Sequence, residues 1–294
     1  MSALGDTRAA GDIVWLGGHA ARDAATVGGK AAPLARLAEA FRVPPGFYVT
    51  TGAHARCGSG ATRDGRLPDD LSAAIADAYA HLGEPTVAVR SSAADEDGAQ
   101  ASFAGQYETY LGVMGVPAVL DAVLRCWAAT ASDRALAYRS GRRAGGAAGG
   151  VAVLVQRLVV ADVSAVAFTV DPVTGDPQAV HVEAAWGFGE SLVGGTVTPD
   201  AYVVRKSDLA VVDRRIADKH RMSVLDDGGV REVDVPRFLR ARPSLDDVQT
   251  VQIARLALDL EREAGRAVDV ECALSDNVVH LLQCRPVTTS PRRP

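Results

Sequence analysis

The sequence has few cysteines, no excess of positive charge and no long hydrophobic run. Its four cysteines, Cys57, Cys126, Cys272 and Cys284, show no metal-ligand spacing, which favours free thiols in a reducing compartment. The 31 Lys and Arg residues are outnumbered by 36 Asp and Glu, and the net charge of -5 argues against a nucleic-acid partner. The longest apolar runs, such as residues 151–155, have the length of a strand and are too short to span a membrane.

The N-terminus also lacks a targeting signal. Residues 1–6 have neither the basic nor the apolar region of a secretory signal, so we expect a cytoplasmic location. With 294 residues, of which 48% are hydrophobic, the chain can bury one large core or two moderate ones.

The first part of the chain predicts alternating helices and strands. Apolar residues at helical spacing over 31–41 predict a helix that begins directly after Lys30, which places Gly28-Gly29-Lys30 at its positive end. A strand over 47–50, a helix over 70–82 and a strand over 86–90 follow. The last of these should carry Arg90 at its end.

The middle of the chain predicts a functional loop and a linker. Residues 93–106 are polar, acidic and punctuated by glycine, and loops of that length in compact domains are usually functional or disordered. We expect a strand over 107–113 and one or two helices over 117–139 after this loop. The glycine-rich residues 141–150 are the best candidate for a hinge or linker.

The second half is rich in strands. Strands are expected at 151–159, 163–170 and 179–185, with one or two more over 201–217. The sequence from Ser244 to Asp247 resembles a capping box with Asp in place of Glu or Gln. It predicts a helix to about residue 263 that Gly265 would end.

The chain then forms a predicted hairpin whose two faces differ. A three-residue turn over 275–277 would pair Asp269 with Gln283 and Glu271 with Leu281. Side chains alternate between the faces of a strand. The polar face would therefore carry Asp269, Glu271, Gln283 and Arg285, and the core face Val268, Val270, Leu282 and Cys284. Two carboxylates and an amide make a plausible magnesium site, and a solvated edge hairpin is the alternative.

Each of the other segments is weak when taken alone. Gly28-Gly29-Lys30 resembles the end of a phosphate loop, but Ala31 stands where a Walker A motif has Ser or Thr, and a helix start with a surface lysine is the alternative. An Arg at a strand end, as for Arg90, is usually solvated. Residues 102–106 could form an ordinary turn.

Read together, the segments resemble the ATP-binding domain of the phosphoenolpyruvate synthase and pyruvate phosphate dikinase family, which rifampin phosphotransferase shares. The resemblance covers nearly the whole chain. Its motifs are Val27-Gly28-Gly29-Lys30, Val43-Pro44-Pro45-Gly46-Phe47, Val89-Arg90-Ser91-Ser92, Ala101-Ser102-Phe103-Ala104-Gly105-Gln106, Arg125-Cys126-Trp127, Thr169-x-Asp171-Pro172, Trp186-Gly187-x-Gly189-Glu190, Thr198-Pro199-Asp200, Asp269-x-Glu271 and Gln283-x-Arg285-Pro286.

The resemblance implies an α+β fold of the ATP-grasp type, in which two lobes clamp the nucleotide. We expect an N-terminal lobe over 1–113, a helical segment and glycine-rich linker over 114–150, a C-terminal lobe over 151–286 and a tail over 287–294.

The resemblance also implies a role for each site residue, with ATP and Mg2+ as cofactors. The catalytic cations would be Lys30, Arg90 and Arg285. The metal ligands would be Asp269, Glu271 and Gln283. A loop closing over the phosphates would comprise Ser102, Phe103, Ala104, Gly105 and Gln106. The adenine-binding edge would comprise Gln156, Arg157 and Leu158, and Glu183 is the candidate for the ribose.

Enzymes of this family pass phosphate through a histidine on a separate domain, and no matching motif is found here. Gly17-Gly18-His19-Ala20-Ala21 is similar but lacks the spacer, and we regard it as a coincidence. His181 alternates with valines on a predicted strand, which favours a structural role. We therefore expect a separate phosphohistidine carrier, with this chain either a natural subunit or a piece of a longer protein. The alternatives are a direct small-molecule kinase, a carboxylate–amine ligase or a non-catalytic nucleotide-binding protein.

Overall fold

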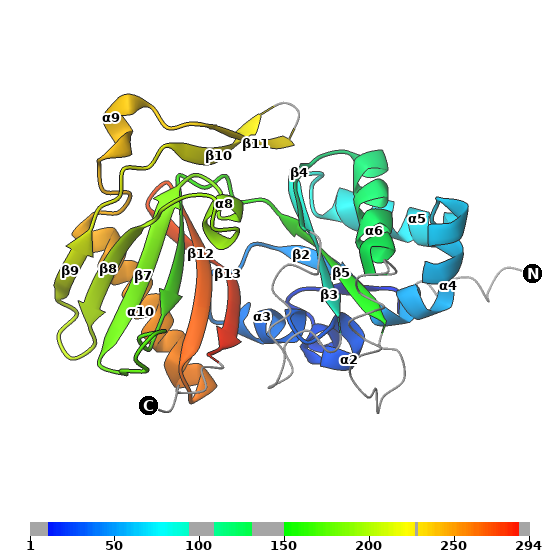
Figure 1. The fold of residues 1–294 in the computed structure, drawn as a ribbon. Coiled ribbons are helices and arrows are strands. Elements are labelled where there is room, and N and C mark those ends of the chain that lie inside the picture. Colours follow the sequence, from blue (N-terminus) through cyan, green and yellow to red (C-terminus); the bar gives the residue numbers. More distant parts are fainter. Residues whose placement is uncertain (1–10, 94–108, 131–149, 227–228, 288–294) are drawn as a thin grey trace, which may run out of the picture. The chain divides into compact units, whose positions relative to one another are not determined.

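The computed structural model describes residues 11–93, 109–130, 150–226 and 229–287 (Figure 1). The chain divides into two compact units, Met1–Leu158 and Val159–Pro294. Each unit combines helices with an antiparallel sheet, so the α+β class expected from the sequence is confirmed. None of the helices in these described ranges has the length and apolar character needed to cross a membrane.

The first unit is built on a five-stranded antiparallel sheet. Its strands occur in the order β1 (Ile13–Trp15), β2 (Gly46–Val49), β5 (Val151–Arg157), β3 (Val87–Ala93) and β4 (Thr109–Val113). β5 lies at the centre, since its first six residues are buried and suit a strand covered on both faces.

Helices of the first unit cover both faces of this sheet. On one face, α4 (Thr51–Asp64), α5 (Asp69–His81) and α6 (Val116–Thr130) pack on a core that includes Val87, Val89 and Trp127. The short helices η1 (His19–Arg22), α2 (Ala24–Val27) and α3 (Ala31–Leu37) belong to the segment between β1 and β2. α3 begins directly after Lys30, as expected, and ends at Leu37 rather than at residue 41.

The expected boundary at residue 150 is corrected by the strand pairing. β5 forms its ladders with β2 and β3, so residues 151–157 belong to the first unit and the division falls between Leu158 and Val159. α6 is part of the same core and does not form a separate helical segment, because Val119, Val123 and Trp127 are buried against the sheet. The glycine-rich residues 141–149 and the expected helix beyond residue 130 lie outside the described residues.

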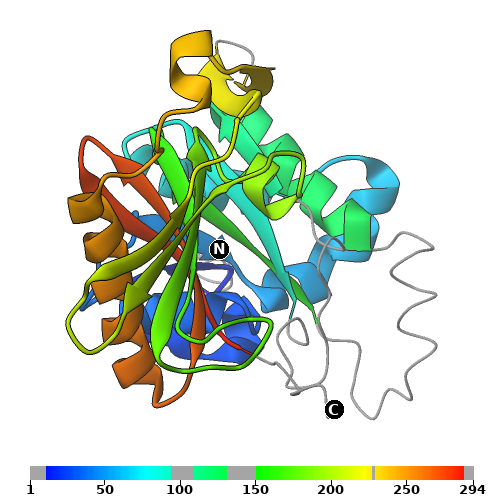
Figure 2. The ribbon, with the colours of Figure 1, turned by 60° about the vertical axis from the view of Figure 1, so that its left-hand side comes forward.

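The second unit is a six-stranded antiparallel sheet with one long helix on one face (Figure 2). The strand order is β13 (Val278–Pro286), β12 (Val268–Ser275), β6 (Val163–Phe168), β7 (Ala179–Trp186), β8 (Asp200–Arg205) and β9 (Val211–Arg215). The helix α10 (Asp247–Ala264) buries its apolar stripe, which includes Ile253, Ala257 and Leu260, against this sheet.

The capping box of α10 lies two residues beyond its predicted position. Asp246 is the N-cap and accepts from the Gln249 N–H at 2.8 Å, while Gln249 accepts from the Asp246 N–H at 2.9 Å. Ser244 does not cap the helix because its N–H and hydroxyl both donate to Asp200, each at 2.7 Å. Gly265 ends the helix with a φ of 63°, as predicted.

An excursion between β9 and α10 was not predicted. It contains the hairpin of β10 (Arg221–Asp226) and β11 (Gly229–Asp234) and the helix α9 (Arg237–Arg240). Asp200 holds both ends of this excursion, because it accepts from the N–H of Ala217 at 2.8 Å and from that of Ser244 at 2.7 Å. The helix α8 (Glu190–Val193) lies beside β10, where the Ser191 and Ser223 hydroxyls are 3.0 Å apart.

All four cysteines are free, as the sequence predicts. Burial raises the pKa of Cys272 and of Cys284 to about 12, with smaller contributions from the nearby carboxylates of Glu271 and Asp269 respectively. These two thiols are therefore protonated at neutral pH and are part of the core.

Candidate nucleotide site

The face of the second sheet that points away from α10 gathers predicted site residues into one row across its strands. Glu271 on β12 lies opposite Gln283 on β13 and, on its other side, opposite Val166 on β6. Val166 in turn lies opposite Glu183 on β7. Directly opposed residues of antiparallel strands point to the same face. The predicted metal ligands Glu271 and Gln283 therefore share a face with the predicted ribose residue Glu183, which is two strands, roughly 10 Å, from Glu271.

A second row lies next to the first on the same face. Asp269 is opposite Arg285 on one side and opposite Phe168 on the other, and Phe168 is opposite His181. Arg285 Nε donates to Asp269 Oδ2 at 2.8 Å, and only 8% of Asp269 is exposed. Arg285 thus balances one of the carboxylates on this face.

The two faces of the sheet differ in burial. Residues that alternate with the two rows, such as Val182, Val270 and Ala167, are at most 1% exposed under α10. On the other face, Val166, Phe168 and Glu271 are half-buried and Glu183 is exposed. The candidate site therefore occupies the face that α10 leaves uncovered.

The hairpin register was predicted wrongly, although the predicted polar face is correct. Asp276 and Asn277 form a two-residue turn with positive φ angles of 49° and 61°, and Ser275 is opposite Val278. The ladder shifts by one residue between Glu271 and Cys272, which leaves Leu282 as the extra residue of a bulge.

The bulge decides which residues share a face. Without it, the register set by the two-residue turn would place Glu271 opposite Leu282 and Asp269 opposite Cys284, because a one-residue slip exchanges the two faces of a strand. With the bulge, these carboxylates lie opposite Gln283 and Arg285. The bulge also leaves Leu281 in the core at 1% exposure, where Leu282 was expected.

In the first unit, the glycine loop before α3 contacts the strand that carries Arg90. Gly28 has a φ of 88°, and a Cβ atom placed on it would lie 2.6 Å from the carbonyl oxygen of Ser92. Only glycine permits this approach and this backbone conformation. Two predicted motifs that are far apart in the sequence are thereby brought into contact.

Arg90 lies on the sheet face that this loop covers. Arg90 and Tyr48 are both opposite Leu154, so all three point to one side, and Ser92 follows two residues later on the same side. The Tyr48 hydroxyl donates to the carbonyl of Ala31 at 3.3 Å, which fixes the residue after Lys30 over this face. Lys30 and Arg90 are both half-buried.

The expected position of Arg90 at a strand end is corrected. β3 continues to Ala93, where it still pairs with β5, so Arg90 lies in the middle of the strand. The remainder of the predicted phosphate-covering loop, including Ser102 to Gln106, lies outside the described residues.

The predicted adenine edge is largely engaged within the first unit. Gln156 is 1% exposed and its amide donates to the Pro44 carbonyl at 2.9 Å. The backbone N–H groups of Arg157 and Leu158 donate to Pro45 and Thr86, each at 2.9 Å. In this structure the Gln156 side chain has a structural role, and these two N–H groups are occupied by protein acceptors.

The sequence matches a known protein family. Residues 60–294 match the family described as "Pyruvate phosphate dikinase, AMP/ATP-binding domain". The chain belongs to this family. The recognition made from the motifs is confirmed, and with it the ATP-grasp class of the fold.

Relatives of this chain differ in their activities. Rifampicin phosphotransferase of Streptomyces sviceus is 39% identical over 90% of this chain and 34% of its own length. The probable phosphoenolpyruvate synthase of Methanocaldococcus jannaschii is 34% identical over 94% of this chain and 27% of its own. The prodigiosin synthesizing transferase PigC of Serratia marcescens is 37% identical over 94% of this chain and 33% of its own length. The chain thus spans about a third of the length of these dikinase-family relatives.

A solved structure of D-alanine–D-alanine ligase from Bacillus anthracis complexed with ATP covers 78% of this chain and 57% of its own. The identity is 9% and the TM-score 0.25. A likeness at this level carries no argument, so the assignment rests on the family match.

The residues of the second sheet fit a magnesium ion of the kind this ATP-binding family implies. Mg2+ prefers oxygen ligands and usually takes one or two carboxylates together with phosphate oxygens and water. Glu271 and Gln283 are directly opposed, and Asp269 follows two residues from Glu271 on the same face. Within the described ranges no group of three or more His, Cys, Asp and Glu has metal-binding geometry, so phosphate and water would have to complete the shell.

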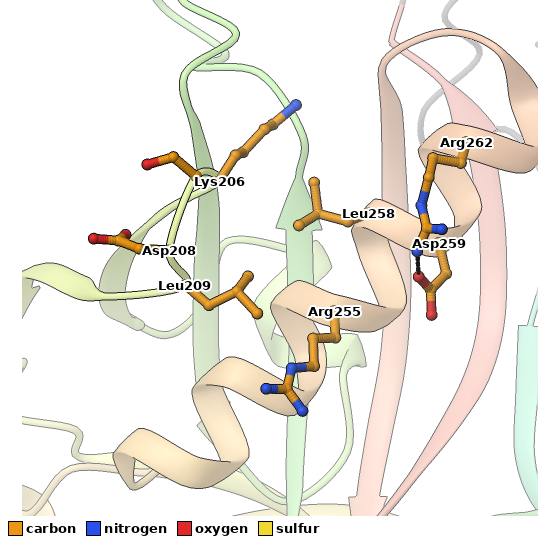
Figure 3. Close-up of a pocket in the computed structure, with 8 residues that line it drawn as sticks. Lys206, Asp208, Leu209, Arg255, Leu258, Asp259 and Arg262 are labelled. Carbon is orange, nitrogen blue, oxygen red and sulfur yellow. Dashed lines mark hydrogen bonds and ion pairs between the residues drawn. The ribbon is translucent and has the colours of Figure 1, made fainter.

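A surface hollow elsewhere in the second unit is a separate feature (Figure 3). It has a volume of about 330 Å3 and lies between the turn after β8 and the helix α10, on the face opposite the two rows. Two of its three lining cations are engaged, because Lys206 binds Glu261 at 2.7 Å and Arg262 pairs with Asp259. We do not assign the nucleotide to it.

The contact of Gly28 with Ser92 gives a first prediction. Gly28→Ala should destabilise the first unit by about 1–3 kcal/mol more than Gly83→Ala, because overpacking adds to the cost of a left-handed backbone. Gly83 is the matched control, since it has the same φ of 88° with no atom within 4 Å of an added Cβ. Urea unfolding measures both variants. Equal losses would show that the loop does not depend on this close approach.

Proposed function

We propose that this chain binds MgATP and supports ATP-dependent phosphoryl transfer of the dikinase type. The observation that carries the proposal is the polar face of the second sheet, where Glu183, Asp269, Glu271, Gln283 and Arg285 occupy two adjacent rows. The bulge places Gln283 and Arg285 of β13 beside the carboxylates of β12, and a solvated hairpin needs no such alignment. Membership of an ATP-binding family supports the same reading.

In this proposal, each unit supplies a different part of the chemistry. Lys30 and Arg90 of the first unit contact the triphosphate, and Arg285 of the second lies near its terminal phosphates. Such transfer depends on positioning and charge neutralisation more than on covalent groups. The loop of residues 102–106 closes over the phosphates and excludes water, which strengthens these electrostatic interactions.

Glu271 and Gln283 hold the metal in this proposal, with Asp269 assisting. A bound Mg2+ would neutralise phosphate charge and orient the nucleotide. Glu183 binds the ribose, and the backbone around residues 156–158 is the proposed adenine edge. The N–H groups of Arg157 and Leu158 would have to leave Pro45 and Thr86 in order to bind the base. The four free thiols support a cytoplasmic setting.

The phosphate acceptor is proposed to be a histidine outside these 294 residues, in a separate protein or a detached domain. ATP then ends as AMP, with one phosphoryl group on the histidine and the other released to water as phosphate. The named phosphotransferase and phosphoenolpyruvate synthase relatives share only 34% and 27% of their own length with this chain, which leaves them room for a carrier and an acceptor domain.

A direct kinase or a carboxylate–amine ligase is the second candidate, because one relative is a rifampicin phosphotransferase, whose named acceptor is a small molecule. The nucleotide product distinguishes the two. A carrier-dependent enzyme forms AMP only when the carrier is present, whereas a direct kinase or ligase forms ADP with a small acceptor alone. Chromatography of nucleotides after incubation with and without neighbouring gene products decides between them. Calorimetry that detects no MgATP binding would reject both, and leave a non-catalytic protein.

The metal assignment gives a second prediction. Glu271→Gln should raise the Mg2+ concentration needed for half-maximal ATP binding by about tenfold or more, because it removes a charged ligand. Calorimetric titrations of ATP at several Mg2+ concentrations measure this change. Glu263→Gln is the control, since Glu263 is exposed near the end of α10. An unaltered Mg2+ requirement in Glu271→Gln would remove this residue from the metal site.

A further inference from the structure

His181 lies on the same face as the candidate nucleotide residues, although its sequence context favours a structural role. It follows Phe168 in the row of Arg285 and Asp269, and it precedes Glu183 by two residues on β7. The side chains of His181 and Glu183 therefore point to the same side, roughly 7 Å apart along the strand. His181 is not part of the core, because 25% of its side chain is exposed.

The charges on this face make His181 distinctive. Ala201 and Val203 of β8 extend the two rows, because they lie opposite Glu183 and His181. The four inner strands β12, β6, β7 and β8 thus contribute eight residues to the rows, and His181 is the one basic side chain among these eight. Three of the eight are the carboxylates of Asp269, Glu271 and Glu183. A triphosphate lying over these rows would meet negative charge from both β12 and β7, with Arg285 as the cation on the β13 side.

An aspartate lies beside the imidazole of His181. The Nε2 atom of His181 is 3.8 Å from Asp171 Oδ2, which is beyond hydrogen-bond distance but close enough for electrostatic attraction. The other carboxylate oxygen of Asp171 accepts from the N–H groups of Val173 at 2.7 Å and Thr174 at 2.9 Å, and these bonds hold the pKa of Asp171 below its usual value. A fixed, ionised carboxylate near one ring nitrogen favours a ring orientation in which the other nitrogen is turned toward a different partner.

We propose that His181, oriented by Asp171, binds the phosphate chain of the nucleotide through its imidazole. This inference rests on the proposed MgATP site and adds a residue to it. Glu183 is assigned to the ribose, and the Asp269–Arg285 row is assigned to the metal and the terminal phosphates. His181 is on the same strand as Glu183 and in the same row as Asp269 and Arg285. Its imidazole therefore lies beside the path from the sugar to the phosphates.

Calorimetry with a series of nucleotides tests this assignment. His181→Ala should weaken MgATP binding by about tenfold or more, the usual effect of losing a hydrogen bond to a charged group, and should leave AMP binding nearly unchanged. His181→Gln, which retains an N–H donor, should recover part of the loss. His220→Ala is the matched control, because His220 forms a similar pair with Asp218 at 3.1 Å but lies outside the two rows.

NMR on the unaltered chain tests the same contact without a variant that could misfold. Addition of MgATP should shift the NMR signals of the His181 ring while those of the His220 ring stay in place. MgATP affinity that is the same in His181→Ala, or an equal loss for AMP and MgATP, would overturn the contact with the phosphates. Failure of the unaltered chain to bind MgATP would overturn the proposed function itself, and this inference with it.

Discussion

Lys30→Ala and Arg90→Ala should each slow MgATP-dependent phosphoryl transfer by about 100- to 1,000-fold, which corresponds to about 2.7–4 kcal/mol of transition-state stabilisation. The expected loss is large because the fold fixes the backbone that carries each side chain before the nucleotide binds. Arg90 lies mid-strand between β4 and β5, and the residue after Lys30 is fixed to Tyr48. Preorganised charge of this kind needs no rearrangement during the reaction.

The rate is measured by chromatography of the nucleotide products with the phosphate acceptor supplied, and MgATP affinity by calorimetry. Arg63→Ala is the control for charge, because the Arg63 side chain is 79% exposed on α4 and contacts only its neighbour Asp64 among the described ion pairs. Urea midpoints close to that of the unaltered chain exclude unfolding as the cause. Rates within a fewfold of the unaltered chain for both variants would contradict the proposed triphosphate contacts.

Lys219→Met should destabilise the second unit by about 3–5 kcal/mol, because it leaves the carboxylate of Asp200 buried without its cation. Lys219 Nζ donates to Asp200 Oδ1 at 2.6 Å, and the two side chains are 1% and 0% exposed. The same carboxylate accepts from Ala217 and Ser244, at the two ends of the β10–β11 excursion. The loss should therefore also free this excursion.

Urea unfolding gives the free energy, and hydrogen exchange of β10 and β11 reports on the excursion. Lys206→Met is the matched control, since Lys206 pairs with Glu261 while the two side chains remain 19% and 24% exposed. Partly solvated pairs contribute about 1 kcal/mol or less, so this variant should lose much less stability. A similar decrease in the free energy of unfolding for Lys219→Met and Lys206→Met would show that burial does not determine how much the Asp200 pair contributes to stability.

Some elements escaped sequence analysis for identifiable physical reasons. α4 was not predicted because Gly52, Gly58 and Gly60 lower its helix propensity. Tertiary packing forms it nevertheless, with Ala53 and Ala61 buried in the core of the first unit. A local signal existed, since Thr50 caps its first turn at 3.2 Å and Gly65 ends it with a φ of 69°.

The candidate site was predictable in composition but not in arrangement. The polar face of the terminal hairpin was identified from the alternation of its side chains, even though the turn length and register were wrong. The two errors offset each other, because the two-residue turn and the bulge at Leu282 together shift the register by two residues and so preserve the face. A slip of one residue would have exchanged the faces.

The sequence by itself determined the family, the α+β class and the polar face of the hairpin, because motifs and the two-residue period of a strand are local properties of the chain. Only the tertiary structure decided that β5 belongs to the first sheet, that Glu183 lies in the row of Glu271, and that His181 joins the row of Asp269. These are pairings between distant segments. They depend on which strands become neighbours and in what register. Strand order and register are selected by packing across the whole unit, in which α10 contacts the strands of one sheet face.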